Sequence, residues 1–315
     1  MSLSVIFLGT AGSIPTPQRG LPAIAIRRKG ELILFDCGEG TQRQMIQASV
    51  GFHRKTKVFI THMHGDHMLG LPGLFQTMSL LDRERKLEIY GPPGIEAFVE
   101  AIRQTVQFTL IFPIEASEII TAGLVCEEKE YEVHACWADH VIPSLAYALV
   151  EKPRPGRFYP EKARALGVPE GPLWSRLQRG SAVKLPSGGV IRPEDVMGPL
   201  RPARKIAYTG DTRPSRSLGK LAEAADLLIH DATFDNELLE KAREDGHSTA
   251  CQAAQTAKKA KAKRLVLFHI SARYKEPDLL LEQAKKIFPH VDVAEDFMKI
   301  DLPLSDVQVK SVRRV

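Results

Sequence analysis

Short runs of aliphatic and β-branched residues recur along the chain and predict buried β-strands. Between them, apolar residues spaced three and four positions apart predict helices that bury one side. The predicted strands are residues 3–8, 23–27, 32–36, 57–61, 87–90, 130–135, 145–150, 205–209, 227–230 and 265–269. The better predicted helices are residues 42–48, 71–81, 95–106, 218–224, 237–244, 249–260 and 279–287.

The order of these elements predicts the fold class. The first third is rich in strands with hairpin-like spacing, whereas the remainder mixes single strands with helices. This order predicts an α/β fold, an αββα sandwich in which two mixed β-sheets pack face to face with helices on both outer sides. We expect this body to span residues 1–304, a protruding, basic and flexible arm to be inserted at residues 151–197, and a polar, basic tail to follow at 305–315.

Composition narrows the class of protein. The chain has 315 residues, of which 43% are hydrophobic and 26% charged, so disorder as the main state is excluded. No apolar run approaches the ~20 residues of a membrane-spanning helix, so no membrane partner is expected. The opening apolar stretch predicts a strand and not a signal peptide. Four cysteines without a CxxC pair favour a reducing, cytoplasmic location.

The positive charge is concentrated in one segment. The formal net charge of the chain is +5, and residues 151–184, with eight basic and three acidic residues, account for all of it. The basic residues are Lys152, Arg154, Arg157, Lys162, Arg164, Arg176, Arg179 and Lys184. The segment is also rich in proline and glycine and contains Phe158, Tyr159 and Trp174. This composition predicts an arm that binds a polyanion, and the alternative is a long solvated loop.

One short motif points to metal chemistry. The sequence His-Met-His-Gly-Asp-His follows a predicted strand and places four ligand-type side chains within six residues. His62 and His64 alternate on an extended chain, so both can face one ion. Asp66 and His67 then point to a neighbouring position. Imidazole and carboxylate ligands suit Zn²⁺ and similar ions.

Three later residues could complete a binuclear site. Asp211, His269 and His140 each lie at or just past the end of a predicted strand, so we expect them to gather at one edge of the sheets. Seven ligands with one shared carboxylate would give each of two metals four protein contacts. Two ions about 3.5–4 Å apart activate a bridging water and stabilise charge on a phosphoryl oxygen.

These motifs carry a resemblance to a known family. The HxHxDH motif with a later His, Asp and His is similar to the metallo-β-lactamase fold superfamily, and the chain resembles its short-form ribonuclease Z (tRNase Z) branch of tRNA 3′-processing endoribonucleases. Seven segments carry the resemblance. They are Phe7-Leu-Gly-Thr, Phe35-Asp-Cys-Gly-Glu-Gly-Thr-Gln, the segment that starts with Thr61-His-Met-His, Thr209-Gly-Asp-Thr, His230-Asp-Ala-Thr, Gly246-His-Ser-Thr and His269-Ile-Ser-Ala-Arg-Tyr. The arm sequence Gly167-Val-Pro-Glu-Gly-Pro-Leu-Trp favours this branch.

The resemblance implies two Zn²⁺ ions per subunit, and Mn²⁺ or Fe²⁺ could occupy such ligands as well. One ion would be held by His62, His64, His140 and Asp211, and the other by Asp66, His67, His269 and the shared Asp211. Asp66 would also orient or deprotonate the attacking water.

The resemblance also implies an acid catalyst. His247 resembles the family's proton donor to the leaving 3′-oxygen, and Asp231, in a HEAT-like motif, resembles the acid that orients it. Asp231 is one methylene shorter than the family's usual glutamate. The alternative for His247 is a residue at a helix start, next to a Ser248 that could cap the helix.

Several residues are implied to contact RNA. The arm resembles an exosite that clasps the tRNA elbow region and serves the active site of the other subunit, which implies a homodimer. Its basic residues would bind phosphates without reading sequence. Arg273 resembles a residue close to the RNA 3′ region. Arg19 lies in a loop that resembles the sensor of the CCA end, where Pro17 and Gly20 replace the usual lysine and asparagine.

Three functions remain open. The leading one is a zinc endoribonuclease that cuts precursor tRNA after the discriminator base and leaves a 3′-hydroxyl on the tRNA. The second is a hydrolase of small phosphodiesters or other esters, against which the basic arm argues. The third is a non-catalytic RNA-binding metalloprotein, against which the His247–Asp231 pair argues.

Overall fold

A computed structural model describes residues 3–186, 188–201, 203–304 and 313–314. The chain divides into two compact units. Unit 1 consists of Met1–Val150 and Arg204–Val315, and unit 2 of Glu151–Ala203. The residues expected to form the arm therefore fall within unit 2. None of the described helices is long and apolar enough to cross a membrane.

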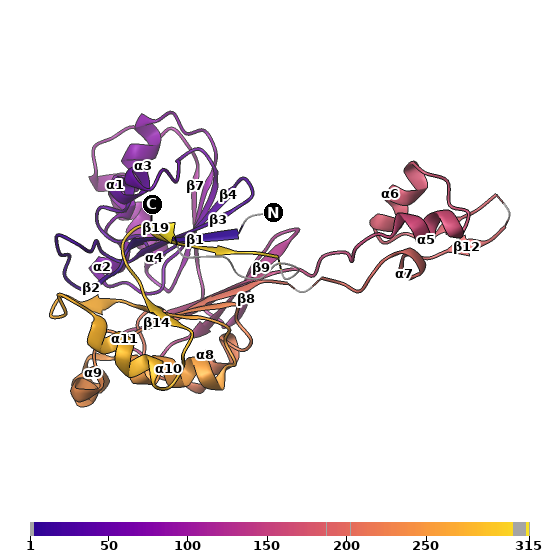
Figure 1. Cartoon of the computed structure of the whole chain (residues 1–315). Coiled ribbons are helices and arrows are strands. Elements are labelled where there is room, and N and C mark those ends of the chain that lie inside the picture. Colours follow the sequence, from indigo (N-terminus) through magenta and orange to yellow (C-terminus); the bar gives the residue numbers. More distant parts are fainter. Residues whose placement is uncertain (1–2, 187, 202, 305–312, 315) are drawn as a thin grey trace. The chain divides into compact units, whose positions relative to one another are not determined.

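Unit 1 contains the two expected mixed sheets, with helices on their outer sides, so the predicted αββα sandwich is confirmed (Figure 1). The first sheet has the order β19 (Arg313–Arg314), β18 (Met298–Leu302), β1 (Leu3–Gly9), β3 (Ala23–Arg28), β4 (Glu31–Phe35), β5 (Lys55–Phe59), β6 (Leu87–Gly91) and β7 (Ile114–Glu118). The second has the order β17 (Val291–Val293), β15 (Leu265–Phe268), β14 (Leu227–Asp231), β13 (Lys205–Tyr208), β10 (Leu145–Glu151), β9 (Tyr131–Trp137) and β8 (Gly123–Glu127).

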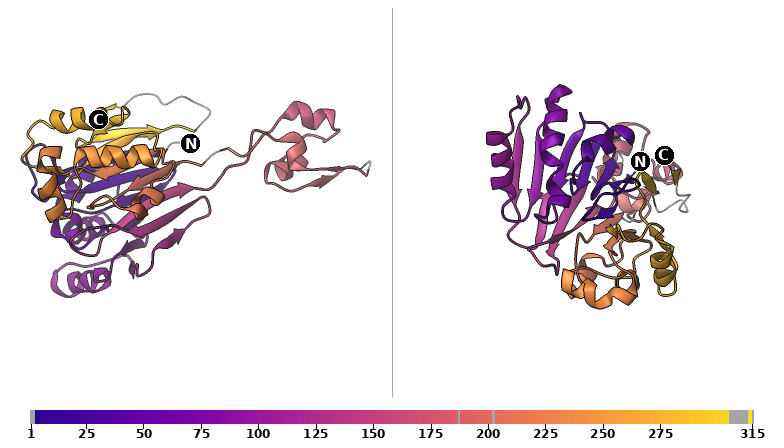
Figure 2. Two further views of the ribbon diagram at one scale, coloured as in Figure 1. Left: turned by 90° about the horizontal axis from the view of Figure 1, so that it is seen from below. Right: turned by 90° about the vertical axis from the view of Figure 1, so that its left-hand side faces the viewer.

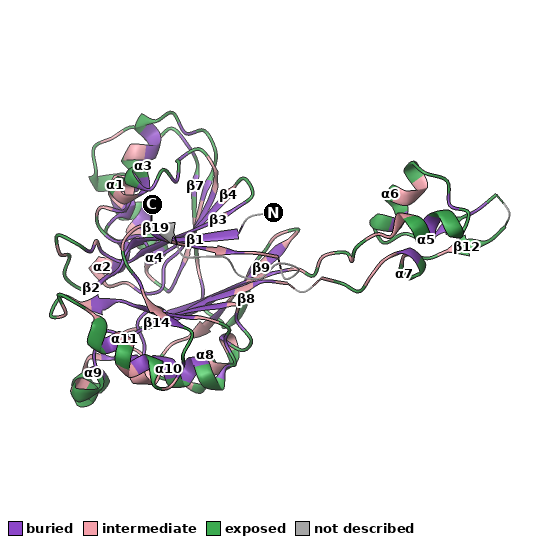
Figure 3. Cartoon of the chain, viewed as in Figure 1, coloured by how far each residue is buried: buried purple, intermediate pink, exposed green. Residues whose placement is uncertain are grey.

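The strands have apolar residues on both faces because both faces of each sheet are covered. In β1, Leu3, Val5 and Phe7 face the core between the sheets, whereas Ile6 and Leu8 face the outer helical layer. The first sheet is covered by α1 (Thr41–Gln47), α3 (Leu71–Leu80) and α4 (Ile95–Thr105). The second is covered by α8 (Arg216–Leu221), α10 (Ala250–Lys259) and α11 (Asp278–Lys285) (Figure 2). Figure 3 shows buried and exposed sides alternating along these helices.

All the strands and helices predicted from the apolar pattern are present, with small shifts at their ends. The prediction missed several strands at or near the sheet edges. β7 reads Ile-Glu-Ala-Ser-Glu and β8 is mostly exposed, so neither carries a strong apolar pattern. Most of the tail predicted at 305–315 lies outside the described residues, but residues 313–314 form β19 and pair with β18.

Unit 2 has a small core of its own. It contains α5 (Pro160–Ala165), α6 (Pro172–Gln178), β11 (Val183–Lys184), β12 (Val190–Ile191) and α7 (Pro193–Val196). The side chains of Phe158 and Trp174 pack against this core with ring centroids 5.2 Å apart. The outgoing and returning chains pair at Arg154 and Arg201, and a side chain at Gly156 would collide with the Gly198 carbonyl. The two aromatic rings therefore stabilise unit 2 itself.

Candidate active site

The HxHxDH motif spans the end of β5 and the short helix α2 (Gly65–Met68). His62 forms an isolated bridge with Ser144, and the main-chain N–H of Leu145 donates to Thr61 O at 2.8 Å. The motif therefore lies where the first sheet meets β10 of the second sheet. His64 precedes α2, which turns the chain so that Asp66 returns toward the same region.

The three later ligand candidates lie at strand ends, where the sequence placed them. Asp211 follows β13, His140 follows β9, and His269 comes directly after β15. His269 has a φ of +61°, a conformation that costs a non-glycine residue free energy and often occurs at functional sites. Gly12 packs against it so closely that an added Cβ would lie 2.8 Å from His269 Nδ1.

The first group of donor atoms comes from His62, His64, His140 and Asp211. His64 Nδ1 lies 3.1 Å from His62 Nε2 and 3.4 Å from His140 Nε2, and His62 Nε2 lies 3.6 Å from Asp211 Oδ2. Donors bound tetrahedrally to one zinc ion at about 2.0–2.2 Å are about 3.3–3.6 Å apart. These three donor pairs, at 3.1–3.6 Å, are therefore spaced nearly as the ligands of a single ion would be.

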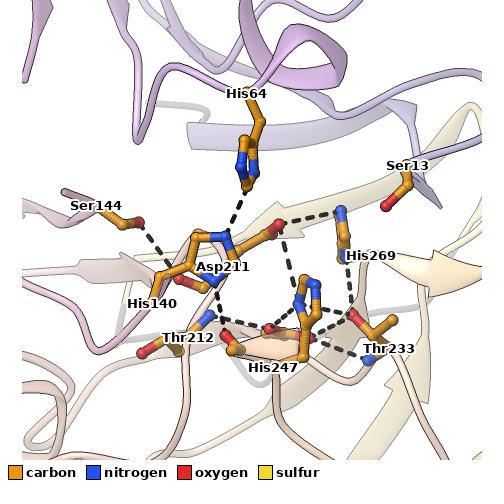
Figure 4. A network of polar contacts seen from close by, with 12 residues as sticks. Ser13, His64, His140, Ser144, Asp211, Thr212, Thr233, His247 and His269 are labelled. Carbon is orange, nitrogen blue, oxygen red and sulfur yellow. Dashed lines mark hydrogen bonds and ion pairs between the residues drawn. The ribbon is translucent and has the colours of Figure 1, made fainter. Parts of the chain in front are cut away.

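The second group comes from Asp66, His67 and His269, and Asp211 connects it to the first. Asp66 Oδ2 lies 3.5 Å from His67 Nε2 and 3.4 Å from His269 Nε2. Asp211 Oδ2 lies 3.3 Å from each of the same two nitrogens. Figure 4 shows side chains from both groups converging on Asp211. One carboxylate oxygen thus lies within reach of both groups, as a bridging ligand requires.

The unsatisfied atoms of this cluster fit a metal. Among the described residues, His67 Nε2 and Asp211 Oδ1 are buried without a hydrogen-bond partner. A buried polar atom without a partner is destabilising, and a coordinated cation removes that cost. Burial lowers the pKa of His62 and His140, which favours the neutral imidazole that binds metals. The seven donors therefore fit a pair of divalent ions.

Asp36 orients one ligand that the sequence identified, but its own role was missed. His67 Nδ1 lies 2.8 Å from Asp36 Oδ2, and the Tyr208 hydroxyl donates to the same oxygen at 2.7 Å. The main-chain N–H of Thr61 donates to the other oxygen at 2.7 Å. Such contacts fix the ring so that Nε2 faces the carboxylates of Asp66 and Asp211. A signal existed, because Asp36 also directly follows a buried strand.

The other histidines are held in the same way. His62 Nδ1 lies 2.9 Å from Thr61 Oγ1. His140 Nδ1 lies 2.8 Å from Gly246 O, and His269 Nδ1 lies 2.8 Å from Thr233 Oγ1. Each contact directs Nε2 toward the centre, whereas His64 presents Nδ1. Thr233 was not identified from the sequence, although it belongs to the HEAT-like motif.

His247 lies between α9 (Leu239–Asp245) and α10, close to the metal ligands. Its Nδ1 is 2.9 Å from Asp231 Oδ2, so the shorter aspartate still reaches the ring. Burial opposes the charged ring, but the Asp231 carboxylate raises the pKa of His247 to about 9. The Asp231 carboxylate therefore favours the protonated form of the ring. His247 does lie at a helix start, but the expected cap is wrong, because Thr249 and not Ser248 caps α10.

Two arginines expected to contact RNA have different surroundings. Arg273 is exposed, lies over the Phe234 ring at 5.0 Å, and lines a cavity of about 300 Å³ together with His247 and Lys241. Arg19 is only 9% exposed, and its guanidinium donates to Thr10 Oγ1 at 2.7 Å and to a main-chain carbonyl. The guanidinium of Arg19 therefore stabilises its own loop, and its contact with RNA stays a prediction.

The basic residues of unit 2 are not equivalent. Arg164 forms an ion pair with Glu170 at 2.7 Å, and Lys162 and Arg157 lie over the Tyr159 ring. Lys152 and Arg154 are partly buried. By contrast, Arg176, Arg179 and Lys184 are exposed and form no ion pair with residues 3–186, 188–201 and 203–304. These last three are the cations most available to a polyanion.

Comparisons with known proteins agree with this geometry. The family model of the anti-Pycsar protein Apyc1 matches residues 3–104, and that of the β-lactamase superfamily domain matches residues 178–270. Ribonuclease Z of Methanosarcina acetivorans is 49% identical over 302 residues, covering 96% of this chain and 98% of that protein. Ribonuclease Z of Methanothermobacter thermautotrophicus is 47% identical over 304 residues, covering 96% and 98%. The crystal structure of human tRNase Z, short form, superposes with a TM-score of 0.71 at 33% identity, covering 96% of this chain and 100% of that chain.

Proposed function

Because the chain belongs to the ribonuclease Z family of metal-dependent endoribonucleases, we propose that it removes the 3′ trailer from precursor tRNA by cutting after the discriminator base. The tRNA would keep a 3′-hydroxyl. The observation that carries the proposal is the position of His247, paired with Asp231, beside a seven-donor cluster that shares Asp211 Oδ2. This pairing supplies both a site for divalent cations and an acid for the leaving oxygen.

The cluster would hold two divalent ions, with Zn²⁺ as the first choice because its ligands are imidazoles and carboxylates. Mn²⁺ and Fe²⁺ accept the same ligand types. When bound, such a pair supplies a water of lowered pKa and positive charge beside the phosphoryl oxygens. The ligands would be His62, His64, His140 and Asp211 for one ion, and Asp66, His67, His269 and Asp211 for the other.

Asp66 would orient the attacking water. Its Oδ2 accepts the main-chain N–H of Ser13 at 3.0 Å and faces the rings of His67 and His269. Burial raises the pKa of Asp66, but the two histidines hold it well below its usual value. The carboxylate therefore stays ionised, which suits hydrogen-bond acceptance and orientation better than proton storage.

His247 would protonate the leaving 3′-oxygen. Its Nδ1–H points to Asp231, so the proton to be delivered is on Nε2. Asp231 is held by the main-chain N–H groups of Thr212 and Thr233, at 2.9 and 3.0 Å. Since the carboxylate is fixed from two sides, it fixes the ring in turn. Proton delivery leaves a neutral 3′-hydroxyl on the RNA.

A mapping experiment tests the proposed function. The purified protein would be incubated with a 5′-labelled precursor tRNA that carries a trailer, with and without a chelator. We expect one product that ends at the discriminator base, and no product once the metal is removed. Cleavage of small phosphodiesters but not of the precursor would instead favour the small-ester hydrolase. RNA binding without any cleavage would favour the non-catalytic metalloprotein.

Unit 2 would bind the tRNA through phosphate contacts. Replacing its three available cations by glutamine should raise the KM for precursor tRNA and leave hydrolysis of bis(p-nitrophenyl) phosphate unchanged. The slope of log binding constant against log salt should fall by about 2–3, because each lost phosphate contact removes about 0.9. The substitutions are Arg176→Gln, Arg179→Gln and Lys184→Gln.

A matched control removes the same charge from unit 1. It replaces the exposed residues Arg85, Lys129 and Lys285 by glutamine. This variant should keep the salt slope of the wild-type protein. An equal loss in both variants would mean that net charge alone, and not unit 2, attracts the RNA.

We also propose a homodimer. Large apolar side chains are exposed on unit 1 at Ile46 of α1, at Leu69 after α2 and at Leu80 of α3, with exposed fractions of 62%, 52% and 75%. Helices α1 and α3 are in contact, and exposed apolar residues on neighbouring elements can form an interface. A cytoplasmic location is proposed as well, since all four cysteines are free.

A further inference from the structure

We propose that Arg213 is a positioning residue that holds His247 in line with the metal ligands. The inference rests on the proposed function, because it assumes that His247 delivers a proton. Arg213 comes two residues after Asp211, and its main-chain N–H donates to Asp139 O at 2.7 Å. This bond fixes the segment that follows Asp211 against the segment that precedes His140.

The guanidinium of Arg213 then reaches the C-terminal end of α9. Its Nε donates to Arg243 O at 2.6 Å, and its Nη2 donates to Glu244 O at 3.3 Å. Both carbonyls belong to the last turn of the helix, where they lack partners within the helix. A cation at this end also interacts favourably with the helix dipole. Arg213 therefore caps α9 with its side chain.

The end of α9 determines where the acid catalyst lies. Gly246 follows the helix with a φ of +83°, and the next main-chain N–H, that of His247, donates to Ala242 O at 2.7 Å. Gly246 O accepts from His140 at 2.8 Å, and a Cβ at Gly246 would lie 2.6 Å from His140 Nδ1. The same turn therefore holds a metal ligand and presents the acid, so a shift of α9 would move His247 relative to the metals.

Arginine suits this position better than lysine. The third nitrogen of the guanidinium, Nη1, donates to Asp139 Oδ1 at 3.1 Å. The guanidinium therefore donates to three oxygens, two at the end of α9 and one on Asp139. A lysine ammonium cannot span this arrangement. The Arg213 and Asp139 side chains are 26% and 53% exposed, so their ion pair adds little stability. The contribution of Arg213 is therefore mainly geometric.

The test compares two substrates with different leaving groups in Arg213→Ala and in a matched control. The precursor tRNA needs a protonated leaving oxygen, whereas the nitrophenolate of bis(p-nitrophenyl) phosphate leaves unprotonated. In Arg213→Ala we expect kcat on the tRNA to fall about 10–100-fold, because small misplacements at a site are costly. KM should stay near wild type, and hydrolysis of the nitrophenyl ester should stay within about twofold. The control is Arg243→Ala, whose exposed side chain takes no part in these contacts.

A double variant makes the test specific to His247. Arg213→Ala combined with His247→Ala should cleave no more slowly than His247→Ala alone, since a misplaced acid and an absent acid have the same effect. Arg213→Lys should recover part of the loss. The metal content of the Arg213→Ala protein should match that of the wild-type protein.

Several results would overturn the inference. These are additive losses in the double variant, equal losses on both substrates, or an equal loss in Arg243→Ala. If His247→Ala itself slowed both substrates equally, the proposed acid role of His247 would fail, and this inference with it. If His247→Ala behaved as proposed and Arg213→Ala did not, only the role of Arg213 would be lost.

Discussion

Replacing Asp211 by alanine is expected to reduce RNA cleavage by at least about 10³-fold, because bound metals supply several kcal/mol of transition-state stabilisation. Asp211 Oδ2 lies 3.3 Å from both His67 Nε2 and His269 Nε2 and 3.6 Å from His62 Nε2. Asp211 Oδ2 thus lies near donors of both groups. Its loss would remove a donor from each ion and the negative charge between them.

Both the metal content and the rate of RNA cleavage should be measured for the Asp211→Ala protein. We expect the purified Asp211→Ala protein to contain less metal per chain than the wild type, and its melting temperature to respond less to added Zn²⁺. Asp278→Ala, which removes an exposed carboxylate from the start of α11, serves as a control and should behave like the wild type. Full metal content together with full activity in Asp211→Ala would refute the shared-ligand arrangement.

Replacing His247 by alanine is expected to slow cleavage of precursor tRNA by about 10²–10⁴-fold, the usual contribution of a general acid. The ring is 9% exposed, and its Nδ1 contacts Asp231 rather than a metal ligand at hydrogen-bond distance. Metal binding should therefore persist in this variant. The expected signature is a loss of kcat on RNA with far smaller loss on the nitrophenyl ester.

His53→Ala provides a matched control, because His53 is exposed and forms no contact with the active-site residues. It should retain wild-type rates on both substrates. A His247→Ala protein that cleaves precursor tRNA at the wild-type rate would show that another group protonates the leaving oxygen. A large drop in its metal content would instead indicate that His247 supports the metals.

The apolar pattern predicted the two-sheet architecture because this fold buries both faces of its central strands. Alternate residues of β1 face the two separate cores, so a near-continuous apolar run was the correct signal. Strands β7 and β8 were not predicted, because their apolar pattern is weak. They lie at the ends of their sheets, where exposed polar residues are tolerated and the pattern weakens.

The surroundings of charged and aromatic residues could not be predicted in the same way. Arg19 looked like an RNA contact, yet its guanidinium is bound by Thr10 and by Ala294 O, which is far away in the sequence. Trp174 looked like part of a basic binding surface, yet it packs in unit 2. The burial and the partners of a side chain depend on contacts between segments that are distant in the sequence. Composition alone does not predict these contacts.

The sequence by itself determined the types of candidate ligand and half of the candidate metal site. Residues two apart on an extended chain face one side, so the local spacing of His62 and His64 was sufficient to predict that they act together. The tertiary structure alone decided that Asp211 Oδ2 lies between the two groups, and that Asp36 and Arg213 hold the surrounding segments. The reason is physical: these contacts join segments far apart in the sequence, and sheet order and loop conformation set their distances.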